Sequence, residues 1–366
     1  MGFSCGIVGL PNVGKSTLFN ALTQTASAQA ANFPFCTIEP NVGRVAVPDE
    51  RLDTLTKLVN PQRTLPTSLE FVDIAGLVEG ASKGEGLGNQ FLGNIKECDA
   101  IAHVVRCFEG EVTHVSGNVD PLRDIGVIET ELMLADMAVA EKRLANVSKK
   151  ANSGDKNAKL EADTLTPILA ALNEGKPVRT VLPGLTDDEK KQAAHYQFLT
   201  SKPLLYVANV EEENAATGNA LSEKVKAHAA ENGAACVVIS AEIESQIAQL
   251  DDAERAEFLE TLGLKQPALN LLIQEGYKLL GLLTFFTAGV QEVRAWTVRS
   301  GSKAPQAAGA IHTDFERGFI KAETIAYEDF VSSGSEAKAK ELGKQRLEGK
   351  EYLVKDGDIF HFKFNV

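Results

Sequence analysis

The sequence is short of cysteine, aromatic residues and long apolar stretches. Its 366 residues include five cysteines, one tryptophan and 6% aromatic residues. An odd number of cysteines without paired metal-ligand spacing argues against a disulfide framework, so no disulfide partner is expected. No apolar run approaches the roughly 18 residues of a membrane span, and the N-terminus lacks a signal-peptide pattern. These absences indicate a cytoplasmic protein with no membrane partner.

Basic charge is also scarce. Acidic residues outnumber basic ones by 50 to 37, and the net charge is −13. A surface of this sign does not favour non-specific binding of nucleic acid, so any such partner requires a local basic patch. With 44% hydrophobic residues, the chain is long enough for one large core or for two to three domains.

The strongest motif that is present is a phosphate-binding loop, G-x-x-x-x-G-K-S, at residues 9–16. Its glycines allow a tight turn and a close approach of backbone N–H groups to phosphate; Lys15 reaches the β- and γ-phosphates, and the Ser16 hydroxyl binds Mg²⁺. An apolar strand at residues 5–8 precedes the loop, and a helix from Ser16 follows it, so a helix N-terminus faces the anion. The predicted nucleotide-binding residues of this loop are Asn12, Val13, Gly14, Lys15, Ser16 and Thr17.

Two further segments have the character of nucleotide switches. Residues 32–41 contain two prolines and are predicted as an extended loop, in which Thr37 is the candidate ligand of Mg²⁺ and the γ-phosphate. Residues 68–73 are predicted as a strand that ends in Asp73. The D-x-x-G sequence starting there assigns Asp73 to Mg²⁺ and the N–H of Gly76 to the γ-phosphate.

The glutamine that orients the attacking water in Ras-type enzymes is missing, and Leu77 in its place has no polar group. Of the six histidines, His114 alone is expected in a loop at the carboxyl end of a nucleotide-site strand, where ligands bind in open α/β sheets. An imidazole can orient water near neutral pH. We predict a catalytic role for His114, with an exposed loop histidine of no role as the alternative. His103, inside the strand at residues 100–107, is predicted to be a core residue.

The guanine-binding motif N-K-x-D is absent as well. After a predicted buried strand at residues 203–208, the expected position carries Asn-Val-Glu-Glu, residues 209–212. Val210 replaces the lysine whose stem covers guanine. Without the aspartate of N-K-x-D, the guanine N1–H and 2-amino group lose their usual acceptor, and a buried polar group left unpaired costs about 1–3 kcal/mol. Strong selection of guanine is therefore not expected. Asn209 can accept from the adenine 6-amino group with Val210 packed on the ring. Phe108 could pack on the base, and an ordinary packing role is the alternative.

A helical pattern begins near Ile128. Apolar residues three and four positions apart run to Ala151 and again from Ala158, on either side of a turn at residues 153–155, which indicates an antiparallel coiled-coil hairpin. Residues 142–159 contain six basic residues and one acidic residue, a net of 6 − 1 = +5. This tip is the best local candidate for an RNA contact, and a solvated charged surface is the alternative.

The C-terminal part is rich in predicted strands. After a helical stretch at residues 252–280, a hairpin is predicted at residues 284–298, a helix or turn at residues 307–315, and a last strand with three alternating phenylalanines. Trp296 and the phenylalanines are expected in a core rather than on a base-stacking surface. The phenylalanines are Phe360, Phe362 and Phe364.

Together these motifs resemble the Obg-like branch of phosphate-loop NTPases. The resemblance is carried by G-L-P-N-V-G-K-S-T, N-F-P-F-C-T-I-E-P-N and D-I-A-G-L, and with the C-terminal motifs the sequence is similar over essentially its full length to the YchF family, the Obg-like ATPases. The resemblance implies an Obg-type nucleotide-binding domain at residues 1–127 and 202–280, an inserted helical coiled-coil domain at residues 128–201, and a C-terminal TGS domain of β-grasp fold at residues 281–366. It also implies that Ser240 lies in the last base-contacting loop. Asn12 is a candidate contact for a monovalent cation such as K⁺, as the matching residue is in potassium-stimulated relatives.

The predicted protein is therefore an α/β phosphate-loop NTPase with an inserted antiparallel coiled-coil hairpin and a C-terminal β-grasp (TGS) domain. The predicted function is that of a ribosome-associated ATPase that requires Mg²⁺, prefers ATP over GTP and acts as a nucleotide switch. The hairpin tip and the TGS domain are the expected contacts with the ribosome or ribosomal RNA. Two alternatives stay open: a GTP-hydrolysing enzyme resembling a translation factor, and a ribosome- or RNA-binding module in which turnover is incidental.

Overall fold

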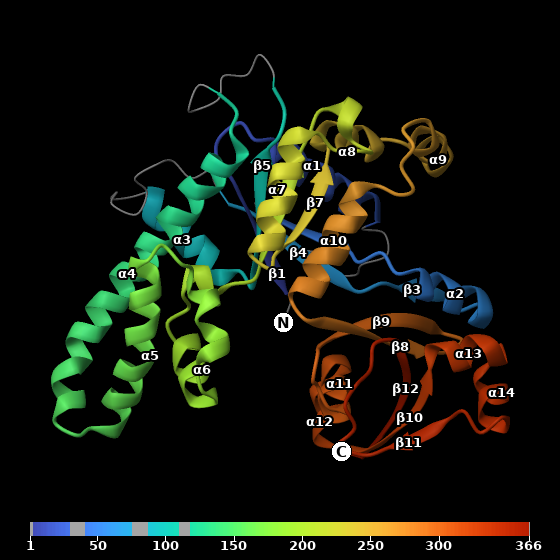
Figure 1. Cartoon of the computed structure of the whole chain (residues 1–366). Helices are drawn as coiled ribbons and strands as arrows, with labels where there is room; N and C mark the ends of the chain where they lie inside the picture. Colours follow the sequence, from blue (N-terminus) through green and yellow to red (C-terminus); the bar gives the residue numbers. More distant parts are fainter. Residues whose placement is uncertain (1–2, 30–40, 75–86, 110–117, 366) are drawn as a thin grey trace.

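The structure, a computed structural model, describes residues 3–29, 41–74, 87–109 and 118–365. Three units can be followed in Figure 1: an α/β unit at the top, a helical arm at the lower left, and a strand-rich unit at the lower right. The predicted site residues Thr37, Gly76 and His114 lie outside the described residues.

The α/β unit is built on a six-stranded sheet of order β2-β4-β1-β5-β6-β7. β2 is antiparallel to β4, and the other neighbouring pairs are parallel. β5 and β6 are buried over their whole length, as expected for central strands covered on both faces. The strands are β1 (Ser4–Val8), β2 (Val42–Ala46), β4 (Ser68–Asp73), β5 (Ala100–Arg106), β6 (Leu204–Asn209) and β7 (Ala235–Ile239).

Helices of the same unit pack their apolar side chains against this sheet in one large core. They are α1 (Lys15–Gln29), α3 (Leu87–Glu97), α7 (Ala220–Glu231), α8 (Ala241–Ile247) and α10 (Ala268–Leu279). The predicted helical stretch at residues 252–280 is interrupted, because α9 (Asp252–Thr261) ends well before α10 begins. The break contains Gly263, at φ +68°, and Pro267, the N-cap of α10.

The arm consists of α4 (Pro121–Asn152), α5 (Lys156–Asn173) and α6 (Asp187–Ala194). The predicted pair of helices is confirmed, with a turn in which the Asp155 side chain accepts from Asn157 N and Ala158 N and so caps α5. The predicted start near residue 128 is wrong, because α4 begins at Pro121 after the N-cap Asp120. The first turns of α4 pack in the core of the α/β unit, and the later turns pack on α5. One helix therefore belongs to both units.

The second sheet has the order β11-β10-β12-β8-β9-β3. The predicted hairpin is confirmed as the antiparallel pair β8 (Leu282–Ala288) and β9 (Glu292–Arg299). Phe360 and Phe362 are buried in the core of this unit, whereas Trp296 is half-buried and Phe364 is 38% exposed. The remaining elements are α11 (Ala304–Ile311), α12 (Thr313–Arg317), β10 (Phe319–Ala326), α13 (Tyr327–Ser333), α14 (Glu336–Glu341), β11 (Arg346–Glu348) and β12 (Asp358–Phe364).

One segment from the first part of the chain is built into this second sheet. β3 (Arg63–Leu65) is its outermost strand, parallel to β9, and α2 (Glu50–Val59) places Leu52 and Leu55 in a core with Phe286. Figure 1 shows α2 and β3 beside β9 rather than beside the first sheet. Residues 50–65, which the predicted domain division gave to the nucleotide-binding domain, thus pack with the C-terminal unit.

This placement can be tested with two leucines on α2. Leu55 is fully buried and Leu58 is 39% exposed. We expect Leu55→Ala to lower the free energy of unfolding of the C-terminal unit by about 2–5 kcal/mol, because it leaves a cavity in that core. The only tryptophan, Trp296, lies on β9, so its fluorescence during urea unfolding reports on this unit.

Leu58→Ala is the matched control, and we expect it to change stability by no more than about 0.5 kcal/mol. An unchanged Trp296 transition in Leu55→Ala would contradict the assignment of α2 to the C-terminal core.

Candidate functional site

The phosphate-binding loop lies between β1 and α1 and lines an open hollow. Two of its glycines have no room for a side chain. A Cβ on Gly14, whose φ is +90°, would lie 2.2 Å from Asn209 Nδ2, and a Cβ on Gly9 would lie 2.7 Å from the Val104 carbonyl oxygen. Asn12 also has a positive φ, 63°. The hollow is lined by Leu10, Pro11, Asn12, Gly14, Lys15, Ser16 and Thr17.

Lys15 and Asp73 meet at the edge of the sheet. Lys15 Nζ lies 3.2 Å from Asp73 Oδ1, and Lys15 is only 9% exposed. They come together because β1 and β4 are parallel neighbours, with Ile7 opposite Asp73, so their carboxyl ends lie side by side. Ser16 is exposed in the first turn of α1. Lys15, predicted to bind phosphate, and two predicted metal-binding residues are therefore at one place in the fold.

These residues fit a magnesium ion of the kind that binds together with nucleotide phosphates. Mg²⁺ in such sites is held by one or two protein oxygens, the phosphates and water, rather than by a cage of protein ligands. A hydroxyl at Ser16 and a carboxylate at Asp73 are the oxygen ligands that this arrangement needs. In the described part of the chain, no group of three or more His, Cys, Asp or Glu side chains forms an independent metal centre.

Asn209 holds the loop in place. Its side chain is 4% exposed, Nδ2 donates to the Val13 carbonyl at 2.9 Å, and Oδ1 accepts from Ala241 N at 2.9 Å. Both ends of the amide are thus engaged with backbone. Ser240, predicted in a base-contacting loop, is 2% exposed and caps α8.

The other predicted base contacts are also covered in this structure. Val210 is 3% exposed and packs in the core rather than on an open surface. The Arg106 guanidinium lies over the Phe108 ring, 4.5 Å from its centroid, and Arg106 Nε donates to the Phe108 carbonyl. This contact favours the packing alternative for Phe108.

Sequence reasoning gave no role to the acidic residues that follow Asn209. Glu212 stands at the fourth position of the N-K-x-D pattern and accepts from Gln246 Nε2 on α8 at 3.3 Å. Glu211 accepts from Glu109 N and from Asn219 Nδ2, and Asn219 also donates to the Cys107 carbonyl. These bonds tie together the loops that follow β5 and β6. The signal in the sequence was the asparagine cap of α7, which Asn219 provides.

A buried glutamate, Glu244, lies next to the loop around Asn209. Glu244 on α8 is 1% exposed, and its two oxygens accept from Ala268 N and Leu269 N at the start of α10. α8 begins at Ala241, which is bonded to Asn209. Glu244 therefore connects the loop around Asn209 to α10, which leads to the C-terminal unit.

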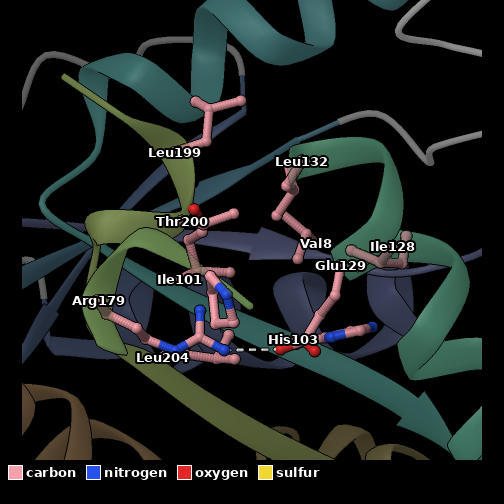
Figure 2. A pocket seen from close by; sticks show the side chains of 11 residues that line it. Val8, Ile101, His103, Ile128, Glu129, Leu132, Arg179, Leu199, Thr200 and Leu204 are labelled. Atoms are coloured by element: carbon pink, nitrogen blue, oxygen red, sulfur yellow. Dashed lines mark hydrogen bonds and ion pairs between the residues drawn. The ribbon is translucent and has the colours of Figure 1, made fainter. Parts of the chain in front are cut away.

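A second cavity lies where the arm joins the α/β unit (Figure 2). Arg179 and Glu129 face each other across it, with Arg179 Nη2 2.7 Å from Glu129 Oε1, which also accepts from the Tyr206 hydroxyl. His103 points into this cluster and is 1% exposed; burial lowers its pKa to about 4, so the ring is neutral at pH 7. The prediction that His103 is a core residue is confirmed. This cavity is a structural junction.

At the hairpin tip, one of the six basic residues is paired. Arg143 forms an ion pair with Glu161, which also accepts from the Tyr196 hydroxyl. Without Arg143 the tip has five lysines against Asp155, a net of 5 − 1 = +4. The lysines are exposed and form no ion pair with any described residue: Lys142, Lys149, Lys150, Lys156 and Lys159.

Within the described ranges, no helix is both long and apolar enough to cross a membrane. The fold and the loop together define a phosphate-loop NTPase of the GTPase type. Residues 4–143 match the family described as "50S ribosome-binding GTPase", and residues 282–365 match a YchF C-terminal family described as "Protein of unknown function (DUF933)".

Full-length relatives make the assignment specific, and the chain belongs to the YchF family. A Haemophilus influenzae protein named "Ribosome-binding ATPase YchF" is 58% identical over 367 residues, and one of the same name from Bacillus subtilis is 57% identical over 369 residues; each alignment covers 100% of both chains. The solved structure of the Schizosaccharomyces pombe YchF GTPase is 37% identical with a TM-score of 0.89, covering 99% of this chain and 98% of that one. The family resemblance predicted from the sequence is confirmed.

The burial of Glu244 gives an expected pH dependence. Burial raises the pKa of this carboxyl to about 7 from an ordinary value of 4.5. Between these values the folded protein holds a proton that the unfolded chain has released, so the free energy of unfolding falls as pH rises from about 4.5 to 7. We expect Glu244→Gln to remove this slope, as measured by urea unfolding at several pH values.

Glu242→Gln on the same helix is the control, because Glu242 is exposed. A stability difference between the wild type and Glu244→Gln that is constant over this pH range would show that Glu244 does not titrate there.

Proposed function

We propose that this chain is a cytoplasmic, Mg²⁺-dependent ATPase that binds the ribosome and acts as a nucleotide switch. The observation that carries the proposal is the approach of Lys15 Nζ to 3.2 Å from Asp73 at the phosphate-binding loop. The full-length relatives from two bacteria are named ribosome-binding ATPases. Hydrolysis and ribosome association are thus combined in one protein.

In the proposed site, each residue has a role that follows from its chemistry. Loop N–H groups and Lys15 neutralise the phosphates, while Ser16 and Thr37 are the ligands of Mg²⁺, supported by Asp73. Held by these residues, Mg²⁺ would supply positive charge that stabilises the phosphates. The Lys15 ammonium has three donors, so it can bind phosphate oxygens while staying near Asp73. Asn12 is the proposed contact for K⁺.

The group that positions the attacking water is proposed from the sequence alone. Gly76 contributes an N–H to the γ-phosphate, and His114 replaces the glutamine that is missing at Leu77. Without such a group, turnover stays near the unaided Ras rate of about 10⁻⁴ to 10⁻³ per second. An activator that supplies a group from outside would have the same effect as His114.

The preference for ATP rests on the residues around Asn209. Val210 offers no polar group and no long stem to cover guanine, which disfavours GTP. Asn209 Oδ1 has a second lone pair with which it can still accept from an adenine 6-amino group while bonded to Ala241 N. The competing candidate is a GTPase. It is favoured by Glu212, a carboxylate near the place of the guanine-binding aspartate, and by the titles "50S ribosome-binding GTPase" and "YchF GTPase".

Ribosome contact is assigned to the two units that project from the α/β unit. The proposed coiled-coil arm presents at its tip five lysines that form no ion pair with a described residue, on a protein of net charge −13. Such a local cluster is what a negatively charged protein needs to bind RNA phosphates. The C-terminal unit, proposed to be a TGS domain of β-grasp fold, is the second contact. The alternative, in which the protein is a binding module with incidental turnover, differs in that ribosome binding would not depend on ATP.

Base preference is tested by calorimetric titration of ATP and GTP in the presence of Mg²⁺. We expect ATP to bind at least about tenfold more tightly, a difference of roughly 1.4 kcal/mol. Lys15→Ala, which removes the phosphate contact, should weaken both titrations and so serves as the control. Equal affinities, or tighter binding of GTP, would replace the ATPase proposal with the GTPase.

The arm is tested by reversing charge at Lys149, Lys150 and Lys156 and measuring co-sedimentation with ribosomes across a salt series, with and without ATP. We expect weaker binding and a salt slope reduced by about one for each lost phosphate contact. The control reverses the exposed residues Lys96, Lys224 and Lys265, which changes net charge equally. Equal loss in both variants would indicate a general charge effect, and unchanged binding would move the contact away from the tip.

A further inference from the structure

A two-stranded ribbon connects the nucleotide site with the C-terminal unit. We call residues 42–47 and 67–73 the ribbon, since β2 and β4 pair along it from Val42 opposite Val72 to Ala46 opposite Ser68. At one end Asp73 N donates to the Asn41 carbonyl at 2.9 Å, beside Lys15. At the other end Val47 N donates to the Thr67 carbonyl at 2.9 Å. Between Val47 and Thr67 the chain leaves the first sheet and enters the second.

Backbone pairing and apolar packing both hold the far end of the ribbon to the C-terminal sheet. Backbone pairing joins β3 to β9, with Thr64 opposite Val293, and apolar packing buries Leu55 against the core that contains Phe286. Because only Pro66 and Thr67 separate β3 from β4, a shift of the second sheet acts on the strand that ends in Asp73.

Arg51 is the charged part of this attachment. Its Nε and Nη2 donate to the two oxygens of Asp49 at 2.9 and 2.8 Å, and Nη1 donates to Asp356 Oδ2 at 2.6 Å. Asp356 Oδ1 in turn accepts from Thr284 N on β8 at 2.8 Å. The guanidinium also lies over the Phe286 ring. Bidentate arginine–carboxylate contacts of this kind fix geometry as well as charge.

A buried polar cluster forms the second point of attachment. Thr67, at the base of the ribbon and 9% exposed, hydrogen-bonds through Oγ1 to Thr297 Oγ1 on β9. The Tyr277 hydroxyl lies 3.0 Å from Thr297 Oγ1 and 3.0 Å from Thr284 Oγ1. Tyr277 is on α10, so this cluster joins the ribbon, the second sheet and the helix that Glu244 connects to the Asn209 loop.

We propose that Arg51 and Thr67 are positioning residues for the metal-binding side of the nucleotide site, and that the ribbon is the physical connection between Mg²⁺·nucleotide and the C-terminal unit. The sheet fixes one end of the ribbon, and so fixes Asp73 at the other, about 20 Å away at 3.4 Å per residue. Coupling of this kind is reciprocal: a bound Mg²⁺·nucleotide stabilises the attachment, and a partner that moves the C-terminal unit displaces Asp73 from Lys15. This inference rests on the proposed function, since it concerns the same site.

The first test uses hydrogen exchange of the wild-type chain with and without Mg²⁺ and a non-hydrolysable ATP analogue. We expect slower exchange in peptides covering residues 50–65 and 292–299, which lie away from the phosphate-binding loop. Protection of the loop peptides without any change at these two segments would overturn the inference alone. No protection at the loop would overturn the proposed function, and the inference with it.

The second test asks whether the attachment sets the metal site. Arg51→Ala and Asp356→Asn each break the link between α2 and β8, and we expect the Mg²⁺ concentration for half-maximal ATP hydrolysis to rise at least about fivefold, the low end of typical coupling factors. Affinity for ATP without Mg²⁺ should stay the same, whereas a general loss of structure would weaken ATP binding under both conditions. Both variants should also lose the nucleotide-dependent protection of residues 50–65.

Arg44→Ala is the matched control. Arg44 pairs with Glu70 on the ribbon itself and does not reach the C-terminal unit, so its Mg²⁺ dependence should match the wild type. The Trp296 unfolding transition verifies that each variant is folded. If Arg51→Ala is unstable, Asp356→Asn serves in its place, because its side-chain oxygen can still accept from Thr284 N. An unaltered Mg²⁺ dependence in a folded variant that lacks the Arg51–Asp356 contact would refute the positioning role.

Discussion

The structure depends on the close packing of Gly14 against the buried amide of Asn209. Because Gly14 has no Cβ, Asn209 can lie under the loop and bond both the Val13 carbonyl and Ala241 N. A buried amide with both ends satisfied holds its partners in one geometry, since losing either bond would leave a polar group unpaired. Three chain segments, the phosphate-binding loop, β6 and α8, are fixed relative to one another by this one side chain.

From this point, two routes of contact lead to the C-terminal unit. One passes through α8, where Glu244 binds the start of α10, and ends at Tyr277. The other is the ribbon between Asp73 and the sheet that contains β3. The arm is joined separately, through the buried cluster of Glu129, Arg179 and Tyr206 and through α4, whose first turns belong to the main core. The nucleotide-binding edge is therefore in physical contact with both projecting units.

Sequence reasoning was most successful where a local pattern dictates local structure. The strand at residues 68–73 was predicted to the residue, and the structure brings Lys15 and Asp73, both predicted for the nucleotide site, to one edge of the sheet. It failed where a pattern continues past a boundary. α4 starts at Pro121 because Asp120 caps it, although its later heptads suggested a start near Ile128. It also did not show that Asn209 is bonded to backbone at both ends or that Val210 is 3% exposed, because a sequence motif does not show what covers a side chain.

The sequence by itself determined the chemistry of this protein: a glycine-rich loop before a helix, a lysine and a hydroxyl at its end, an acid at the end of a neighbouring strand, and family membership over the whole chain. The loop and strand features are short-range, so spacing alone specifies them, whereas the family follows from resemblance over the full length. Only the tertiary structure decided that residues 50–65 belong to the C-terminal sheet and that Arg143 is paired with Glu161. Strand pairing and ion pairing between residues far apart depend on which surfaces are brought together when the chain folds, and no local pattern encodes that choice.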